Sequence, residues 1–316
     1  MTAREHKPLE LTVQVETQDG LFTSVTSGSG VSKGLQVMSC DSVSRSLNSL
    51  DPTDQNGVDK LVCTLDGSAD LSEFGRELVL GISIATAKAG AAAMKSDLVS
   101  YLARNTEQNQ IGAPVPMMPI FKCSNHSAMS VIPFDAINYH DAMNQLEKLM
   151  KKLPLEQPKN EVEMMDCLSR EISNSGSLVC LIGENSKFES IINENVLAWV
   201  SPLKVYNSES WIELNKKTQH VQLFGELSLD LLENVPLAHL ESGFAFRLNN
   251  YGTLTQALHA VKLAKENSME QMFINDNCLD NEFVAGLCVS QCFHVIYLEE
   301  TSPDLVAQFT KIEKSF

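Results

Sequence analysis

Three cysteines near the end of the sequence have a type and a spacing that could support chemistry. Cys288 and Cys292 lie four residues apart and Cys278 is nearby, so a metal site is one interpretation. Structural zinc sites usually carry CxxC pairs, however, and the sequence has none. Cys288 and Cys292 fall in the apolar stretch GLCVSQCFHVIYL, where thiols are usually buried. We therefore expect buried cysteines here rather than a metal centre.

Charge and hydropathy limit the partners of this chain. Its 316 residues carry 24 Lys and Arg against 40 Asp and Glu, a formal net charge of -16. Such a chain repels phosphate backbones, which argues against nucleic-acid binding. No apolar run reaches the ~18 residues that a membrane span needs, and the first thirty residues lack an apolar signal core. With eight cysteines and no such signal, we expect a cytoplasmic protein with reduced thiols and no membrane partner.

The first hundred residues have the pattern of a small α+β domain. Polar and apolar residues alternate over 9–17, Asp19-Gly20 marks a tight turn, and 21–26 can return as a second strand. Helices are expected over 41–50 and 73–102. A polar stretch over 104–112 then reads as a linker.

The second of these helices has an unusual content of small residues. Along LDGSADLSEFGRELVLGISIATAKAGAA (65–92), apolar side chains recur at helical spacing, at Phe74, Leu78, Ile82, Ala85 and Ala89. Gly81, Gly90 and six alanines between positions 85 and 93 would let another backbone approach closely. We expect this helix to be buried.

After residue 113 the pattern changes to repeated short apolar runs. Their starts lie roughly 18 to 28 residues apart, which is typical of strand–helix units and a parallel sheet; the runs are 178–182, 196–200, 221–224, 244–248, 272–274 and 294–298. A helix is signalled after Thr253, which forms a capping-box pattern with Gln256. A (β/α)8 barrel usually takes about 250 residues. Residues 113–316 number only 204, so a barrel here would have trimmed loops.

Several segments resemble the enolase family, and their order and approximate spacing match it from end to end. The LDG turn, the FG pair and the KAGAA helix end at 65–92 are near-identical to the family pattern. The other matching segments are the opening hairpin and loop at 12–29, the barrel entry APVPMMPI at 113–120, the KVNQ-like region at 243–267 and the last helix at 302–316. The resemblance implies an α/β fold, with an α+β N-terminal domain over residues 1–105 and a degenerate, TIM-like (β/α)8 barrel over 113–316.

The resemblance also implies a chemistry, the loss of water from 2-phosphoglycerate to give phosphoenolpyruvate in glycolysis. This lyase reaction uses a lysine base, a glutamate acid, loop histidines and Mg²⁺ held by three acidic residues. The lysine position is Arg247 in this sequence. A guanidinium stays protonated and cannot serve as a base. Arg247 could instead hold a 2-phosphoglycerate-like anion through two parallel hydrogen bonds, or form a structural ion pair.

The acidic metal ligands that the resemblance implies are reduced as well. The first falls at Gly183, with Glu184 one residue on, and the second falls in Trp199-Val200-Ser201-Pro202, which has no acid. The third falls in Gly225-Glu226-Leu227, so Glu226 could coordinate. Mg²⁺ needs oxygen donors in near-octahedral geometry. We expect Mg²⁺ binding to be weak or lost, with Glu226 and Glu184 as candidate ligands or simply as exposed strand-end glutamates.

The loop residues of the family are only partly present. His126 maps to the loop histidine, but no Asp or Glu lies between Phe121 and Phe134 to serve as the acid. The second histidine motif falls in FINDNCLD (273–280), which has neither His nor Arg. The early loop keeps Ser27, Gly28 and Ser29 as substrate-binding candidates, although Ser/Gly loops are more often flexible connections.

These losses fall together while the packing motifs remain. The sequence therefore favours an enolase-like pseudoenzyme that acts by binding or scaffolding. The alternatives are an active Mg-dependent phosphopyruvate hydratase, with Glu226, Glu184 and Arg247 in altered roles, and a different lyase or carboxylate-binding chemistry at the same strand ends. Family members are typically homodimers through an arginine-containing opening, which MTAREHKP does not resemble. We expect a weaker dimer or a monomer.

Overall fold

The computed structural model of the protein describes residues 9–28, 43–48, 50–104, 112–124, 127–153, 158, 160–172, 176–203, 208–234, 243–275, 280–300 and 302–315. The chain divides into two compact units. The first comprises Met1–Glu107, Leu248–Ala260 and Asp276–Gln291, and the second comprises Gln108–Arg247, Val261–Asn275 and Cys292–Phe316. The first unit thus includes two segments from beyond residue 113. Within the described residues, no helix is both long enough and apolar enough to cross a membrane.

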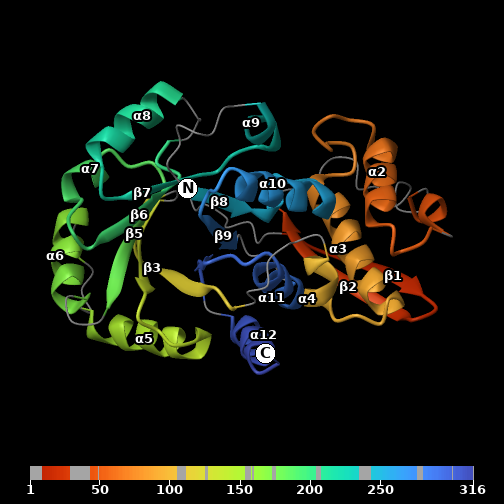
Figure 1. The fold of residues 1–316 in the computed structure, drawn as a ribbon, viewed down its shortest axis with the longest axis horizontal. Coiled ribbons are helices and arrows are strands. Elements are labelled where there is room, and N and C mark those ends of the chain that lie inside the picture. Colours follow the sequence, from red (N-terminus) through yellow and green to blue (C-terminus); the bar gives the residue numbers. More distant parts are fainter. Residues whose placement is uncertain are drawn as a thin grey trace, which may run out of the picture. The chain divides into compact units, whose positions relative to one another are not determined.

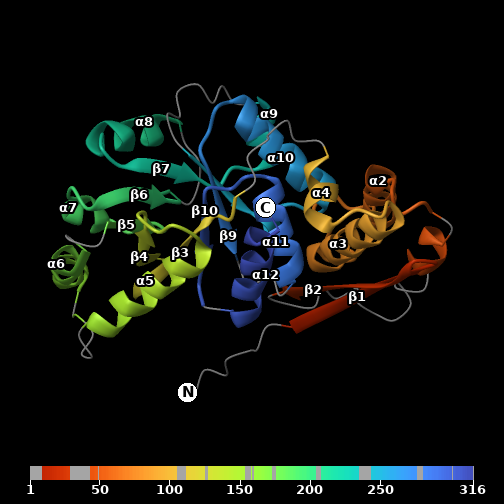
Figure 2. The same ribbon diagram turned by 60° about the horizontal axis from the view of Figure 1, so that its bottom comes forward.

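A β-hairpin opens the first unit, as the sequence predicts (Figures 1 and 2). Strands β1 (Leu9–Thr17) and β2 (Gly20–Gly28) pair antiparallel, with Thr17 opposite Gly20. The helices of this unit are α2 (Gln55–Asp66), α3 (Arg76–Ala93), α4 (Leu98–Ala103), η2 (Leu248–Asn250), the start of α10 (Leu254–Glu266) and α11 (Asn281–Ser290). Residues 43–47 are helical within the predicted 41–50, whereas residues 41, 42 and 49 lie outside the described part. The sequence did not predict α2.

The single helix predicted over 73–102 is wrong, because the chain forms two helices there. Helix α3 ends at Ala93, and Lys95 takes a left-handed φ of 54°. The Asp97 side chain then accepts a hydrogen bond from Ser100 N at 2.9 Å, which caps the start of α4. The apolar periodicity continues across the break, so the periodicity alone could not locate it.

Helix α3 is buried on nearly all sides rather than along one face. A Cβ atom on Gly90 would lie 2.5 Å from the Pro52 carbonyl oxygen, and one on Gly81 would lie 2.8 Å from Val13 Cγ2. The close backbone approach predicted from the small residues is therefore confirmed at Gly90. The neighbour is backbone at Gly90 and a hairpin side chain at Gly81. Ser24 of β2 also donates a 2.6 Å hydrogen bond to the Gly81 carbonyl oxygen.

A buried carboxylate joins three helices of this unit. Asp59 of α2 accepts hydrogen bonds at 2.6–3.0 Å from Gln55 Nε2, Ser83 Oγ, Thr255 N and Thr255 Oγ1. Burial raises the pKa of Asp59, while these four donors favour the charged form. Ser83 Oγ also accepts from Leu254 N at 2.9 Å, so side chains of α2 and α3 satisfy the first backbone N–H groups of α10.

The predicted capping box at α10 forms in altered geometry. Thr253 Oγ1 accepts from Gln256 N at 3.3 Å, as the pattern predicts. The Gln256 side chain, however, accepts from Gly252 N at 3.0 Å and not from Thr253 N.

A second buried polar contact involves Lys88 of α3. Its Nζ lies 2.7 Å from Asp280 Oδ1 and donates to the Thr23 carbonyl oxygen at 3.1 Å. The side chains of Lys88 and Asp280 are 13% and 5% exposed. Asp280 also caps α11 by accepting from Phe283 N at 3.1 Å. This ion pair therefore holds β2, α3 and α11 together within the first unit.

The second unit contains a closed eight-stranded barrel, which confirms the predicted α/β barrel (Figures 1 and 2). Its strands in spatial order are β10 (Val295–Leu298), β3 (Val115–Ser124), β4 (Ser127–Pro133), β5 (Ser177–Ile182), β6 (Val196–Val200), β7 (Gln222–Gly225), β8 (Gly243–Arg247) and β9 (Gln271–Asn275). The helices are α5 (Tyr139–Lys152), α6 (Glu161–Ile172), α7 (Phe188–Ile191), α8 (Ser208–Lys217), α9 (Leu229–Asn234), α12 (Pro303–Glu313) and the end of α10.

The barrel departs from a purely parallel repeat at its first strands. Strand β4 runs antiparallel to both β3 and β5, whereas the other neighbouring pairs are parallel. The regular strand–helix repeat therefore starts at β5. From there, the six predicted apolar runs agree with the observed strands to within one residue at either end.

The interior of the barrel is filled by apolar side chains from all eight strands. These residues are Met117, Ile132, Cys180, Ala198, Val200, Phe224, Ala245, Met272, Ile274 and Tyr297. Alternate strand residues point inward, so the next inward positions beyond Phe224 and Ala245 are Glu226 and Arg247. Charged residues can thus reach the barrel axis only where a strand ends.

The close contact at Gly90 makes a testable prediction. We expect Gly90→Ala to lower the free energy of unfolding by about 1–2 kcal/mol, because the clash with the Pro52 carbonyl outweighs the higher helix propensity of Ala. Gly112→Ala is the control, since an added Cβ there meets nothing within 4 Å. Urea unfolding of the two variants provides the comparison. Equal stability of Gly90→Ala and wild type would show that the backbone contact is not tight.

Candidate functional site

Three neighbouring barrel strands end in polar residues that contact one another. Ser201 follows β6, Glu226 follows β7, and Arg247 is the last residue of β8. Arg247 Nε lies 2.8 Å from Glu226 Oε2, and Arg247 Nη2 lies 3.1 Å from Glu226 Oε1. Ser201 Oγ donates to Glu226 Oε1 at 2.5 Å. Both oxygens of the Glu226 carboxylate are therefore engaged by protein donors.

The charges of Glu226 and Arg247 are paired with each other and partly buried. The side chains of Glu226 and Arg247 are each 26% exposed. A two-point guanidinium–carboxylate contact is strong and geometrically specific. Of the two roles considered for Arg247, anion binding and ion pairing, the structure shows an ion pair with Glu226. Neither group presents an uncompensated charge.

Ser201 occupies a conformation that few non-glycine residues adopt. Its φ is 51°, in the left-handed region, which costs of order 1 kcal/mol or more. Its amide N–H donates to the Phe224 carbonyl oxygen at 2.8 Å, and its hydroxyl reaches Glu226. Sequence reasoning treated this position only as a missing acid, although a hydroxyl directly after a strand is a signal that could have been used.

The surroundings of the ion pair are apolar. Val200 is 1% exposed and belongs to the barrel interior, at the place where the resemblance implies an acidic metal ligand. Burial raises the pKa of Tyr297 to about 12, with Glu299 acting in the same direction and Arg247 against it. The Tyr297 phenol is therefore neutral at ordinary pH and presents no anion to a metal.

The predicted magnesium ligands do not form a recognisable site in the described residues. Glu184 is exposed after β5, and Gly183 takes a left-handed φ of 82° with its carbonyl accepting from Trp199 Nε1 at 2.8 Å. In the part of the chain that the structure describes, no group of three or more His, Cys, Asp or Glu is arranged to hold a metal. With Glu226 engaged by Arg247 and Val200 apolar, these residues do not fit Mg²⁺.

The remaining predicted site residues lie outside the described residues or directly beside such a segment. His126 and Ser29 lie outside the described residues. Ser27 and Gly28 are the last residues of β2, where their backbones pair with Glu10 and Leu9. The side chain of Ser27 lies outside the described part.

The cysteines agree in part with the expectation of burial. Cys288 is fully buried in α11, whereas Cys292 is only half-buried. Burial raises the pKa of the Cys292 thiol, which lowers its reactivity at neutral pH. Cys278 lies outside the described residues.

In barrel enzymes the active-site residues lie at the carboxyl ends of the parallel strands. The candidate residues of this chain lie at the same ends. Residues 11–102 match the family model of the enolase N-terminal domain. The chain is also 23% identical over 345 residues to the enolase of Mycoplasma pneumoniae, covering 84% of this chain and 75% of that protein. The two matches support a divergent member of the enolase family, and the closed barrel is consistent with that family's fold.

The ion pair at the barrel mouth can be tested by a double-mutant cycle. We expect Glu226→Gln and Arg247→Met each to destabilise the protein, and the double variant to lose less than the sum, with a coupling of about 1 kcal/mol. Denaturant unfolding of all four proteins measures it. The exposed pair Glu147–Lys151, 3.8 Å apart, is the control and should show a smaller coupling. Strict additivity at 226 and 247 would contradict a stabilising pair.

Proposed function

We propose that this chain is an enolase-fold pseudoenzyme that acts by binding or scaffolding and does not convert 2-phosphoglycerate to phosphoenolpyruvate. The observation that supports this most is the contact between Arg247 and Glu226. By resemblance, Arg247 stands at the position of the base and Glu226 at the position of a metal ligand. In this chain the two side chains neutralise each other.

The first missing function is proton removal. Water loss from 2-phosphoglycerate needs a base that takes a weakly acidic proton beside a carboxylate. A guanidinium holds its proton at any ordinary pH. Glu226 is a carboxylate, but both of its oxygens already accept hydrogen bonds from Arg247 and Ser201. The described mouth of the barrel therefore supplies no evident base.

The second missing function is stabilisation of the doubly negative intermediate. This task requires several oxygen ligands around a metal ion. Glu226 is engaged, and the buried Val200 cannot coordinate. Loss of one charge-stabilising group typically costs a hundredfold or more in rate. Replacement of several such groups supports a loss of lyase activity rather than a modest reduction.

An active Mg-dependent phosphopyruvate hydratase is the alternative that the assay below addresses. A 2-phosphoglycerate-like anion would have to displace Glu226 from Arg247 before it could bind there. A different lyase, or carboxylate binding at the same strand ends, would face the same competition. The identity of any protein partner is left to experiment.

Location and oligomeric state form part of the proposal. We propose a cytoplasmic location because the described cysteines are free thiols, which a reducing compartment preserves. We also propose a monomer or a weak homodimer, with light scattering as its test. A stable dimer at nanomolar concentration would contradict it.

The lyase assay tests the central proposal. We expect no phosphoenolpyruvate from 2-phosphoglycerate and Mg²⁺ with either wild type or Arg247→Lys, because restoring a titratable amine does not restore the metal ligands. The absorbance of phosphoenolpyruvate is the readout, and an active enolase is the positive control. Turnover by wild type would favour the active hydratase. Turnover by Arg247→Lys alone would show that a single replacement accounts for the loss.

Magnesium binding has a readout that does not depend on turnover. A ligand that binds only the native state raises the melting temperature as its concentration exceeds its dissociation constant. We expect millimolar Mg²⁺ with 2-phosphoglycerate to leave the melting temperature unchanged relative to an equal ionic strength of NaCl. A rise of several degrees that Glu226→Ala abolishes would reveal a metal site.

A further inference from the structure

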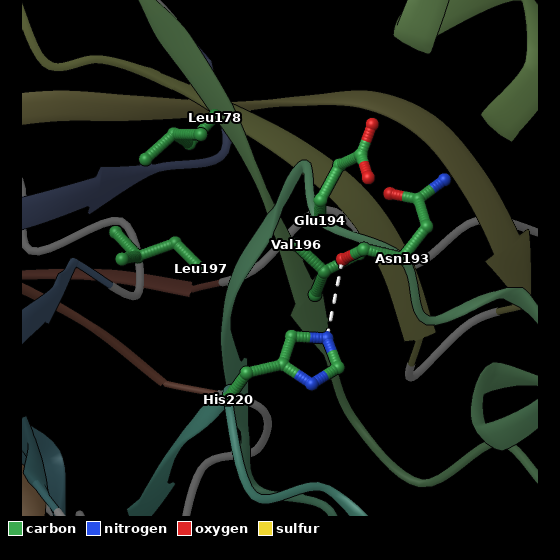
Figure 3. A pocket seen from close by; sticks show the side chains of 6 residues that line it. All are labelled: Leu178, Asn193, Glu194, Val196, Leu197 and His220. Carbon is green, nitrogen blue, oxygen red and sulfur yellow. Dashed lines mark hydrogen bonds between the residues drawn. The ribbon is translucent and has the colours of Figure 1, made fainter.

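A separate pocket lies at the opposite end of the barrel from Glu226 and Arg247. It has a volume of about 460 Å³ and is lined by Leu178, Asn193, Glu194, Val196, Leu197 and His220 (Figure 3). These residues lie at or just before the amino ends of β5, β6 and β7. The five residues of β6 span about 16 Å, which separates this amino-end pocket from the ion pair at the barrel mouth. No part of the proposed function uses it.

One wall of the amino-end pocket is apolar. Leu178 and Leu197 are half-buried and pack against the barrel interior, and Val196 is buried. The exposed parts of the two leucines therefore remain as apolar surface toward the pocket. Small-molecule sites typically have volumes of about 300–1,000 Å³ and a mainly apolar lining with a few polar groups. The amino-end pocket has both properties.

The opposite wall is polar and rich in hydrogen-bond acceptors. Figure 3 shows the Glu194 carboxylate and the Asn193 amide on one side of the pocket, with Leu178 and Leu197 on the other. His220 Nε2 lies 3.3 Å from the Asn193 carbonyl oxygen, which orients the imidazole. In the neutral tautomer that donates from Nε2, Nδ1 is a further acceptor. Glu194 is the one formally charged residue among the six that line the pocket.

We infer that the amino-end pocket binds a small organic cation with an apolar body, of which a primary alkylammonium is the simplest example. The apolar chain would cover Leu178 and Leu197, and the ammonium would donate to the Glu194 carboxylate. A lining with one carboxylate and no Lys or Arg disfavours anions. The formal charge of -16 acts in the same direction over longer range. This inference is independent of the pseudoenzyme proposal.

Three probes of equal chain length separate the apolar and the charged contributions: n-hexylammonium, hexan-1-ol and n-hexanoate. Titrations followed by the ¹⁵N amide resonances of Asn193, Glu194 and Leu197 give both the affinity and the location. We expect hexylammonium to bind about fivefold more tightly than hexanol, as for a partly exposed ion pair, and hexanoate to bind most weakly.

Matched variants assign the preference to the pocket. Glu194→Gln should remove the advantage of hexylammonium over hexanol, whereas Glu209→Gln, which removes an exposed charge on α8, should keep it. Leu197→Ser should weaken all three probes, and circular dichroism and melting temperature verify that each variant is folded. Hexanoate binding as tightly as hexylammonium, an unchanged preference in Glu194→Gln, or no binding of hexylammonium to wild type would each overturn the inference.

Discussion

Closure of the barrel is the constraint on which the rest of the second unit depends. When β10 pairs with β3, every inward position of eight strands faces a sealed interior, and apolar side chains from all eight strands fill it. A charge inside such a space is costly unless it is paired. The charged inward residues Glu226 and Arg247 lie where strands end, and there they contact each other. Closure of the barrel thus accounts for the pairing of these two charges at the strand ends.

The same constraint bears on Val200, at a position where the resemblance implies an acid. Burial of an aliphatic side chain such as Val200 stabilises a protein by about 1.5–3 kcal/mol relative to leaving it exposed. A carboxylate in that position would need a metal ion or another partner. Without such a partner, valine is the more stable choice. Under the proposed non-catalytic function, the buried Val200 therefore adds packing at a position where the resemblance implies an acid.

The sequence predicted the regular elements well because their patterns are local. The hairpin follows from the alternation in residues 9–17, and the strands from β5 onward follow from isolated apolar runs. Strands β3 and β4 had no such signal, since Pro116 and Pro119 interrupt β3 and the polar run KCSNHS (122–127) separates its apolar part from that of β4. The break at Lys95 was missed because it depends on a cap and not on periodicity. Glu226 and Arg247 were singled out separately, but only strand adjacency brings residues 21 positions apart into contact.

The discontinuous first unit has a consequence for synthesis on the ribosome. Asp59 finds two of its four hydrogen-bond donors in Thr255, 196 residues later, and Lys88 finds its carboxylate at Asp280, 192 residues later. At about 5–20 residues per second, the ribosome needs roughly 10–40 seconds to make the intervening chain. During that interval Asp59 has only the donors from Gln55 and Ser83, and Lys88 lacks the Asp280 carboxylate. An N-terminal domain usually folds before the next one is made, but the first unit here is incomplete until residues 248–260 and 276–291 have been made. A nascent chain stalled before residue 255 should therefore remain accessible to proteases and chaperones.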